Sequence, residues 1–225
     1  MASAGGSCYT PAMRARTLLT GARAALAAAL VLAAAPAMAQ SRSIYGGGVD
    51  ADAALVRLVD AGAPGEVELW LGAETLKAGA LGEATPYRAV VADVYMLGYL
   101  GKRYEFMPEP GSLYTVAATA GGLVVLEDER HDDPARAQLY FYNLGAAPAE
   151  LRTADGSVLV AGPCAPGGSA QVAVNPVQVG LAAYSGGAKA GEPLRLRLER
   201  GASYSVFVYP GSSGPAAFSV KAALE

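Results

Sequence analysis

The residue types that could support acid-base catalysis in this chain are an aspartate and the sole histidine, spaced as Asp128-x-x-His131. In such a pattern a histidine can act as a general base while the aspartate orients its ring. A nucleophilic serine on a tight turn would also be needed, and the sequence offers Ser157 after Asp155-Gly156 but no Gly-Asp-Ser block. The pair lies in the densest charge cluster of the chain, 127–134, which contains a proline and is predicted to be a solvated linker. Because a base on a flexible linker cannot be held in a catalytic geometry, no catalytic residue is predicted.

A second candidate nucleophile is Ser203, in the block Gly201-Ala-Ser-Tyr-Ser205. This block is loosely similar to the Gly-Thr-Ser-Tyr-Ser nucleophile block of periplasmic polysaccharide acetyltransferases. An internal repeat explains it better, because Pro110-Gly-Ser-Leu-Tyr-Thr-Val116 and Arg200-Gly-Ala-Ser-Tyr-Ser-Val206 align as one turn that enters one strand. Ser203 then corresponds to Leu113, so the block is interpreted as structural.

The segment Leu194-Arg-Leu-Arg-Leu-Glu-Arg200 alternates apolar and charged residues. In a strand this alternation places Arg195 and Arg197 on one face and the leucines on the other. A half-buried strand needs such a pattern in any case, so a merely solvated face is one interpretation. Arginine is also the usual planar partner of carboxylates. The candidate site for an acidic partner surface or a uronate is therefore Arg195, Arg197 and Arg200.

No metal or cofactor is expected. The histidine and Cys164 are far apart in sequence, and the acidic cluster lacks the spaced ligands and the glycine of a calcium loop. Twelve tyrosines accompany a single tryptophan, and an exposed subset of them could stack on sugar rings. A carbohydrate-binding module therefore stays open as an alternative.

Residues 1–39 have the features of a signal peptide. Three arginines precede an apolar run over 24–35, and Pro36-Ala-Met-Ala39 provides small residues for cleavage. The run is shorter than the roughly 20 residues that span a bilayer. The protein is predicted to be exported, most simply to a bacterial periplasm, without a transmembrane segment in the mature chain; Met13 is an alternative start.

The charge of the mature chain restricts its partners. Removal of residues 1–39 takes away three of the 17 basic residues and none of the 20 acidic ones, which leaves a net charge of −6. This sign disfavours nucleic acid and an anionic membrane surface as main partners.

The pattern of the mature chain predicts an all-β fold, because short β-branched or aromatic segments alternate with Gly or Pro. Leu55–Asp60 followed by Val67-Glu-Leu69 is repeated as Leu139–Asn143 followed by Ala149-Glu-Leu151. We therefore expect two tandem small β-sandwich domains joined by a short charged linker. Their predicted boundaries are an extended arm at 40–52, a first sandwich at 53–128, the linker at 129–134 and a second sandwich at 135–225. The expected elements include one strand over 87–95, one over 157–160 and a turn over 162–166.

Several blocks of the second unit, in their order and spacing, resemble the AlgF family, the periplasmic accessory proteins of alginate O-acetylation. The blocks are Ala137-Gln-Leu-Tyr-Phe-Tyr-Asn-Leu144, Leu151-Arg-Thr-Ala-Asp-Gly156, Val174-Asn-Pro-Val-Gln-Val179 and Leu196-Arg-Leu-Glu-Arg-Gly201. Ile44-Tyr45-Gly46 and Ala54-Leu-Val-Arg-Leu-Val59 resemble the start of the mature protein in that family. Between 72 and 107 the resemblance is thin.

The resemblance implies a non-catalytic member of an acetylation machinery. In that family a membrane-bound O-acyltransferase moves acetyl groups across the inner membrane, periplasmic O-acetyltransferases place them on the polymer, and the AlgF-like protein connects these parts. The predicted function is a periplasmic adaptor, not an enzyme, required for O-acetylation of an alginate-like exopolysaccharide. The alternatives are a carbohydrate-binding module for an acidic polysaccharide and an SGNH-like acetyltransferase or esterase.

Overall fold

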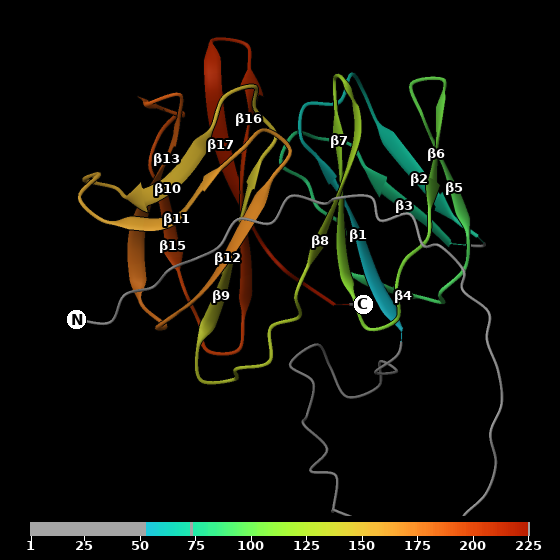
Figure 1. Cartoon of the computed structure of the whole chain (residues 1–225), viewed down its shortest axis with the longest axis horizontal. Helices are drawn as coiled ribbons and strands as arrows, with labels where there is room; N and C mark the ends of the chain where they lie inside the picture. The colour runs from blue at the N-terminus through green and yellow to red at the C-terminus, as the bar shows by residue number, and fades with distance from the viewer. Residues whose placement is uncertain (1–52, 73, 225) are drawn as a thin grey trace, which may run out of the picture.

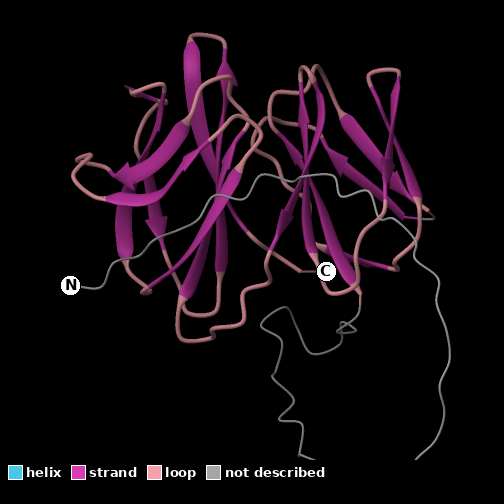
Figure 2. Ribbon diagram, viewed as in Figure 1, coloured by secondary structure: helices cyan, strands magenta, loops and turns pink. Residues whose placement is uncertain are grey.

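A computed structural model of the chain describes residues 53–72 and 74–224. These residues form strands, turns and irregular segments and contain no helix (Figure 2). The all-β prediction is confirmed. Within the same ranges, no helix is available that could cross a bilayer. The predicted signal peptide and the arm at 40–52 lie outside the described residues.

The first half consists of a four-stranded sheet and two hairpins. The sheet has the order β4-β1-β7-β8, in which β1 and β7 are parallel and the other neighbours are antiparallel. The hairpins β2–β3 and β5–β6 lie side by side through β2 and β5 and cover one face of the sheet. The strands are β1 (Ala54–Asp60), β2 (Val67–Leu71), β3 (Glu74–Ala78), β4 (Arg88–Val90), β5 (Tyr95–Tyr99), β6 (Lys102–Phe106), β7 (Leu113–Thr119) and β8 (Gly122–Asp128).

The second half repeats this arrangement. An inner sheet has the order β12-β9-β16-β17, and an outer sheet has the order β11-β10-β13, with β14 and β15 both paired to β13. The strands are β9 (Ala137–Asn143), β10 (Ala149–Thr153), β11 (Leu159–Cys164), β12 (Ser169–Val174), β13 (Gln178–Ser185), β14 (Ala188–Lys189), β15 (Leu194–Arg197), β16 (Ser203–Gly211) and β17 (Gly214–Lys221).

The duplication seen in the sequence is confirmed by strand pairing and by one matched pair of tyrosines. Tyr114 lies opposite Val56 across the parallel pair β1–β7, and Tyr204 lies opposite Leu139 across the parallel pair β9–β16. Each tyrosine hydroxyl accepts a hydrogen bond from the backbone N–H five residues earlier, at 3.1 Å in the first half and 3.2 Å in the second. Apart from β14, each strand of one half therefore has a counterpart in the other.

The two inner sheets pack face to face, so the described chain forms four layers. Leu55, Leu113 and Ala117 from the first half share a buried cluster with Tyr142 and Phe207 from the second. Each half also has a separate core between its inner and outer layers. β1 and β9 are consequently buried on both faces, which explains why most of their residues are apolar or aromatic. Figure 1 shows the two halves side by side, with β5 and β6 at one end and β13 and β15 at the other.

Four local expectations are wrong. The strand predicted over 87–95 is two strands, because β4 ends at Val90 and β5 begins at Tyr95. The strand predicted over 157–160 and the turn predicted over 162–166 are displaced, because β11 begins at Leu159 and continues to Cys164, which is buried in the core of the second half. The charge cluster is not uniformly solvated, since Asp128 is only 8% and His131 only 4% exposed. The domain boundaries, and with them independent folding of each half, stay a prediction.

Candidate functional site

The arginine strand lies on the outer sheet of the second half. β15 pairs with β13, so that Arg197 is opposite Gln178 and Arg195 is opposite Gly180. Arg195 and Arg197 are exposed, whereas Leu196 and Leu198 enter the core of this half. The alternation predicted from the sequence is therefore the alternation in the fold.

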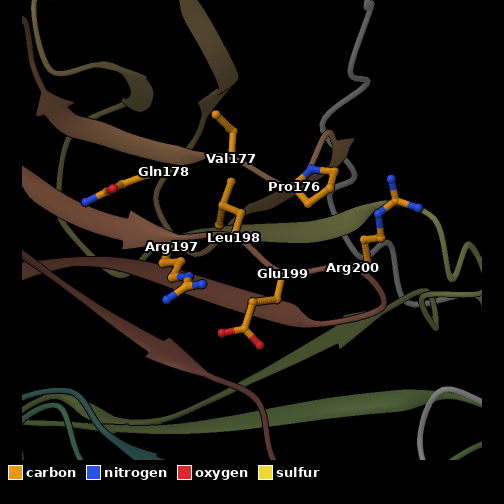
Figure 3. A pocket seen from close by; sticks show the side chains of 7 residues that line it. All are labelled: Pro176, Val177, Gln178, Arg197, Leu198, Glu199 and Arg200. Atoms are coloured by element: carbon orange, nitrogen blue, oxygen red, sulfur yellow. The ribbon is translucent and has the colours of Figure 1, made fainter.

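A groove of about 550 Å³ opens beside this strand (Figure 3). Figure 3 places Arg197 and Arg200 on either side of Glu199 along the same segment. Two of the arginines that the sequence singled out thus line one concave surface, which Arg195 extends along β15. The lining residues are Pro176, Val177, Gln178, Arg197, Leu198, Glu199 and Arg200.

Backbone hydrogen bonds hold the segment that carries these arginines. The hydroxyl of Tyr204 donates to the carbonyl oxygen of Arg197 at 2.6 Å and accepts from the N–H of Glu199. The N–H of Leu198 donates to the carbonyl of Val177 at 2.9 Å. The backbone of the groove is therefore fixed before any ligand arrives, and only the long side chains remain free to adapt.

The charge of the groove is dominated by arginine. The carboxylate of Glu199 accepts a hydrogen bond from the ammonium group of Lys221 at 2.8 Å, and this contact lowers the pKa of Glu199. Within residues 53–72 and 74–224, no ion pair joins a carboxylate to Arg195, Arg197 or Arg200. Their guanidinium groups are available to an incoming carboxylate, which they can bind through two parallel hydrogen bonds.

Asp128 and His131, the residues considered for catalysis, are both buried and hydrogen bonded within the fold. The hydroxyl of Tyr142 donates to the Asp128 carboxylate at 2.5 Å. His131 Nε2 lies 3.0 Å from the carbonyl oxygen of Arg136, which also accepts the N–H of Gly201 at 2.7 Å. Because a carbonyl oxygen only accepts, Nε2 carries the proton in this contact. His131 thereby ties the connecting segment to the turn that enters β16.

The two candidate serines have different surroundings. Ser203 is buried at the start of β16. Ser157 is in the exposed turn between β10 and β11, where its hydroxyl donates to the Asp155 carboxylate at 2.9 Å. Hydrogen bonds from Thr153 and Ser157 lower the pKa of Asp155 to about 2. This network stabilises the turn and keeps Asp155 charged.

A buried polar cluster between the two halves was missed by sequence reasoning. The Arg57 side chain is fully buried, donates from Nε to Thr115 at 3.0 Å and from Nη2 to Ser205 at 2.5 Å, and lies 4.6 Å from the centre of the Tyr87 ring. Burial raises the pKa of nearby Asp128 to about 7, although the Tyr142 hydrogen bond and the Arg57 charge oppose that rise. The available signal was one arginine inside an apolar strand, Leu55-Val-Arg-Leu-Val59.

A family model described as "Alginate O-acetyl transferase AlgF" matches residues 27–205. This span contains most of the described strands and also Arg195, Arg197 and Arg200. The chain belongs to the AlgF family. The resemblance drawn from the sequence blocks is thereby confirmed, and with it a role in alginate biosynthesis.

Two AlgF relatives match over most of their length. The alginate biosynthesis protein AlgF of Pseudomonas putida is 28% identical over 186 residues, which cover 81% of this chain and 86% of the relative. AlgF of Pseudomonas aeruginosa is 28% identical over 196 residues, which cover 87% and 90%. A solved structure of the C-terminal domain of AlgF from P. aeruginosa is 29% identical, covers 39% of this chain and 98% of that domain, and gives a TM-score of 0.36.

Proposed function

We propose that this AlgF family member is a non-catalytic periplasmic adaptor, required for O-acetylation of an alginate-like exopolysaccharide, and that it binds an acidic partner through Arg195, Arg197 and Arg200. The observation that carries the proposal is the exposure of these arginines beside a groove whose backbone is fixed by Tyr204. A preformed cationic surface in a mature chain of net charge −6, after removal of residues 1–39, favours recognition of carboxylates.

The assignment of an adaptor rather than an enzyme rests on how the reactive groups are used. Asp128 is engaged by Tyr142 inside the protein, and His131 Nε2 is engaged by a backbone carbonyl. A general base must reach the proton that it abstracts, and a nucleophile must be accessible to substrate. These two side chains are buried and already hydrogen bonded, which supports a structural role.

The proposed partners are periplasmic O-acetyltransferases, the membrane-bound O-acyltransferase, or both, reached in the periplasm after removal of residues 1–39. A uronate of the polymer is the second candidate for the same groove. It is favoured by the pairing of Gln178 with Arg197, since an amide and a guanidinium together can bind sugar hydroxyl and carboxylate groups. Either ligand should bind less tightly as salt increases.

The double variant Arg195→Glu/Arg197→Glu tests the proposal. Both side chains are exposed, so the free energy of unfolding should change by no more than about 0.5 kcal/mol. Polymer acetylation, measured by NMR in cells that depend on this chain, should be abolished because the surface now repels carboxylates. The matched control is Lys189→Glu, which reverses an exposed charge on the same outer sheet and should leave acetylation unchanged.

Normal acetylation by a stably folded double variant would reject the groove as the working surface. Binding of purified chain to uronate oligomers distinguishes the two candidate ligands. Salt-sensitive binding of the oligomers that requires Arg197 would favour the polymer as the ligand. If the oligomers do not bind, but the double variant still loses acetylation in cells, a protein partner is favoured.

A further inference from the structure

The outer layers of the two halves are equivalent but carry different chemistry. In the first half the layer consists of β3, β2, β5 and β6, and in the second it consists of β11, β10, β13 and β15. The pair Tyr95–Phe106 across β5–β6 corresponds to the pair Val179–Leu196 across β13–β15. The outward positions can therefore be compared one by one.

At these outward positions apolar side chains replace polar ones. Met107 stands where the second half has Arg197, and Val94 stands where it has Gln178. Likewise Trp70 follows the buried Leu69 of β2, at the place where Arg152 follows the buried Leu151 of β10. Two copies of one scaffold thus carry exposed arginines on one outer layer and exposed apolar side chains on the other. The strands of these two layers lie at opposite ends of the molecule (Figure 1).

The apolar face is strongly exposed. Trp70 is 63%, Val94 52%, Met96 53% and Met107 66% exposed, and we call these four residues the outer patch. Gly72, the residue after β2, lies against the Tyr95 ring at the start of β5, and β2 and β5 contact each other, so that Trp70 and Met96 are on neighbouring strands. Scattered exposed apolar residues need no explanation, but large ones gathered on the outer face of two adjacent hairpins indicate an interaction site.

We infer that the outer patch is a second docking surface, for a folded protein partner, at the opposite end of the molecule from the arginine groove. The inference rests on the proposed adaptor function, because it supplies the second contact that an adaptor needs. Tryptophan and methionine are enriched at protein interfaces, where a few aromatic anchors carry most of the binding free energy. The shared core of the two halves would keep the two surfaces at a fixed separation.

Charges around the patch favour a protein over a polyanion. Glu68 pairs with Lys77 across β2–β3, and Glu105 lies on the same strand as Arg103. A rim of both signs complements a protein surface that has its own apolar centre and mixed rim. It does not complement a uronate polymer or an anionic lipid surface, whose charges all have one sign.

The tip of the β5–β6 hairpin, four residues beyond Met96 in the chain, supports the same inference. Leu100 has a φ of 50° in the turn between β5 and β6 and is 47% exposed. A left-handed conformation and solvent exposure both disfavour leucine, and asparagine or glycine is preferred in such turns. A leucine at this position costs folding free energy because of its left-handed backbone, and such a residue is expected where a partner contacts the hairpin tip.

In-cell photocrosslinking tests the inference without relying on acetylation. A photoreactive amino acid replaces Thr75, which is exposed and lies opposite Trp70 across β2–β3. We expect one adduct, with a protein component of the acetylation machinery identified by mass spectrometry. In Trp70→Ser/Met96→Ser its yield should fall at least about tenfold, because loss of an anchoring tryptophan weakens binding by that factor or more. Leu100→Asn should lower the yield while the thermal midpoint stays unchanged or rises.

The matched control is Val158→Ser/Leu159→Ser, which removes two exposed apolar side chains from the second half and should leave the adduct unchanged. An undiminished adduct in a folded Trp70→Ser/Met96→Ser variant would overturn the inference. So would an adduct with polymer or lipid, adducts with many proteins, or none at all. Failure of the proposed function can be distinguished from failure of this inference. If the proposed function is wrong, cells without this chain should acetylate the polymer normally, whereas the crosslink reports only contact between the patch and a partner.

Discussion

Replacement of the buried carboxyl group between the halves, Asp128→Asn, should stabilise this protein at alkaline pH. Asp128 is 8% exposed, and burial raises its pKa from the ordinary 3.8 to about 7. Asparagine has nearly the same shape and keeps a carbonyl oxygen that can accept the hydrogen bond of the Tyr142 hydroxyl. The substitution therefore acts as a permanently neutral Asp128.

The size of the effect follows from proton linkage. Between about pH 4 and pH 7 the folded chain retains a proton on Asp128 that the unfolded chain has released, so stability falls as pH rises through this window and is level above it. A pKa displaced from 3.8 to about 7 corresponds to about 4 kcal/mol at pH 8. The attraction of Arg57 for the charged form is already contained in that displacement, so Asp128→Asn should gain about 2 to 4 kcal/mol at pH 8 and almost nothing near pH 4.

Urea unfolding of both proteins at several pH values measures this difference directly. The difference between the two chains isolates Asp128, because every other titrating group is common to both. Asp132→Asn, an exposed neighbour in the same charge cluster, is the control and should follow the wild-type curve. If Asp128→Asn is no more stable than wild type at pH 8, the Arg57 charge and the Tyr142 hydrogen bond outweigh the cost of burial, and the reasoning fails.

Three further outcomes are expected. Purified chain should not hydrolyse a chromogenic acetate ester, and activity that disappears in His131→Ala would contradict the adaptor assignment. Tyr204→Phe and Tyr114→Phe should each lower the free energy of unfolding by about 1 kcal/mol in urea titrations, because each hydroxyl accepts a hydrogen bond from a backbone N–H in the turn before its strand. An unchanged free energy of unfolding in both variants would show that these hydrogen bonds do not stabilise the fold. Fragments 53–128 and 135–225 should each unfold cooperatively by circular dichroism, at midpoints below that of the intact chain, because separation exposes the core they share. A fragment without cooperative unfolding would make the two halves one folding unit.

The local sequence pattern predicted several strands well where neighbouring residues decide them. The strand patterns recognised at 67–69, 139–143 and 149–151 all lie within strands of the fold, because alternation and flanking Gly or Pro specify an extended segment locally. The segment 87–95 failed for the opposite reason. Its valines favour extended structure, yet Val91 and Val94 lie in a break where the chain leaves the inner sheet for the outer hairpin. The position at which a chain passes from one layer to another depends on tertiary packing, and β propensity does not predict it.

The sequence by itself determined that this chain is a duplicated all-β protein and that Arg195 and Arg197 face away from leucines, because a period of two fixes the face of each residue in a strand. It also contained the blocks that place the chain in the AlgF family. Only the tertiary structure decided that the inner sheets pack on each other, with Arg57 and Asp128 buried between the halves. It also decided that His131 is buried beside Arg136 instead of lying in a solvated linker. The physical reason is that burial depends on what covers a face. A charged residue in a strand or linker has the same local pattern whether water or a second sheet lies against it.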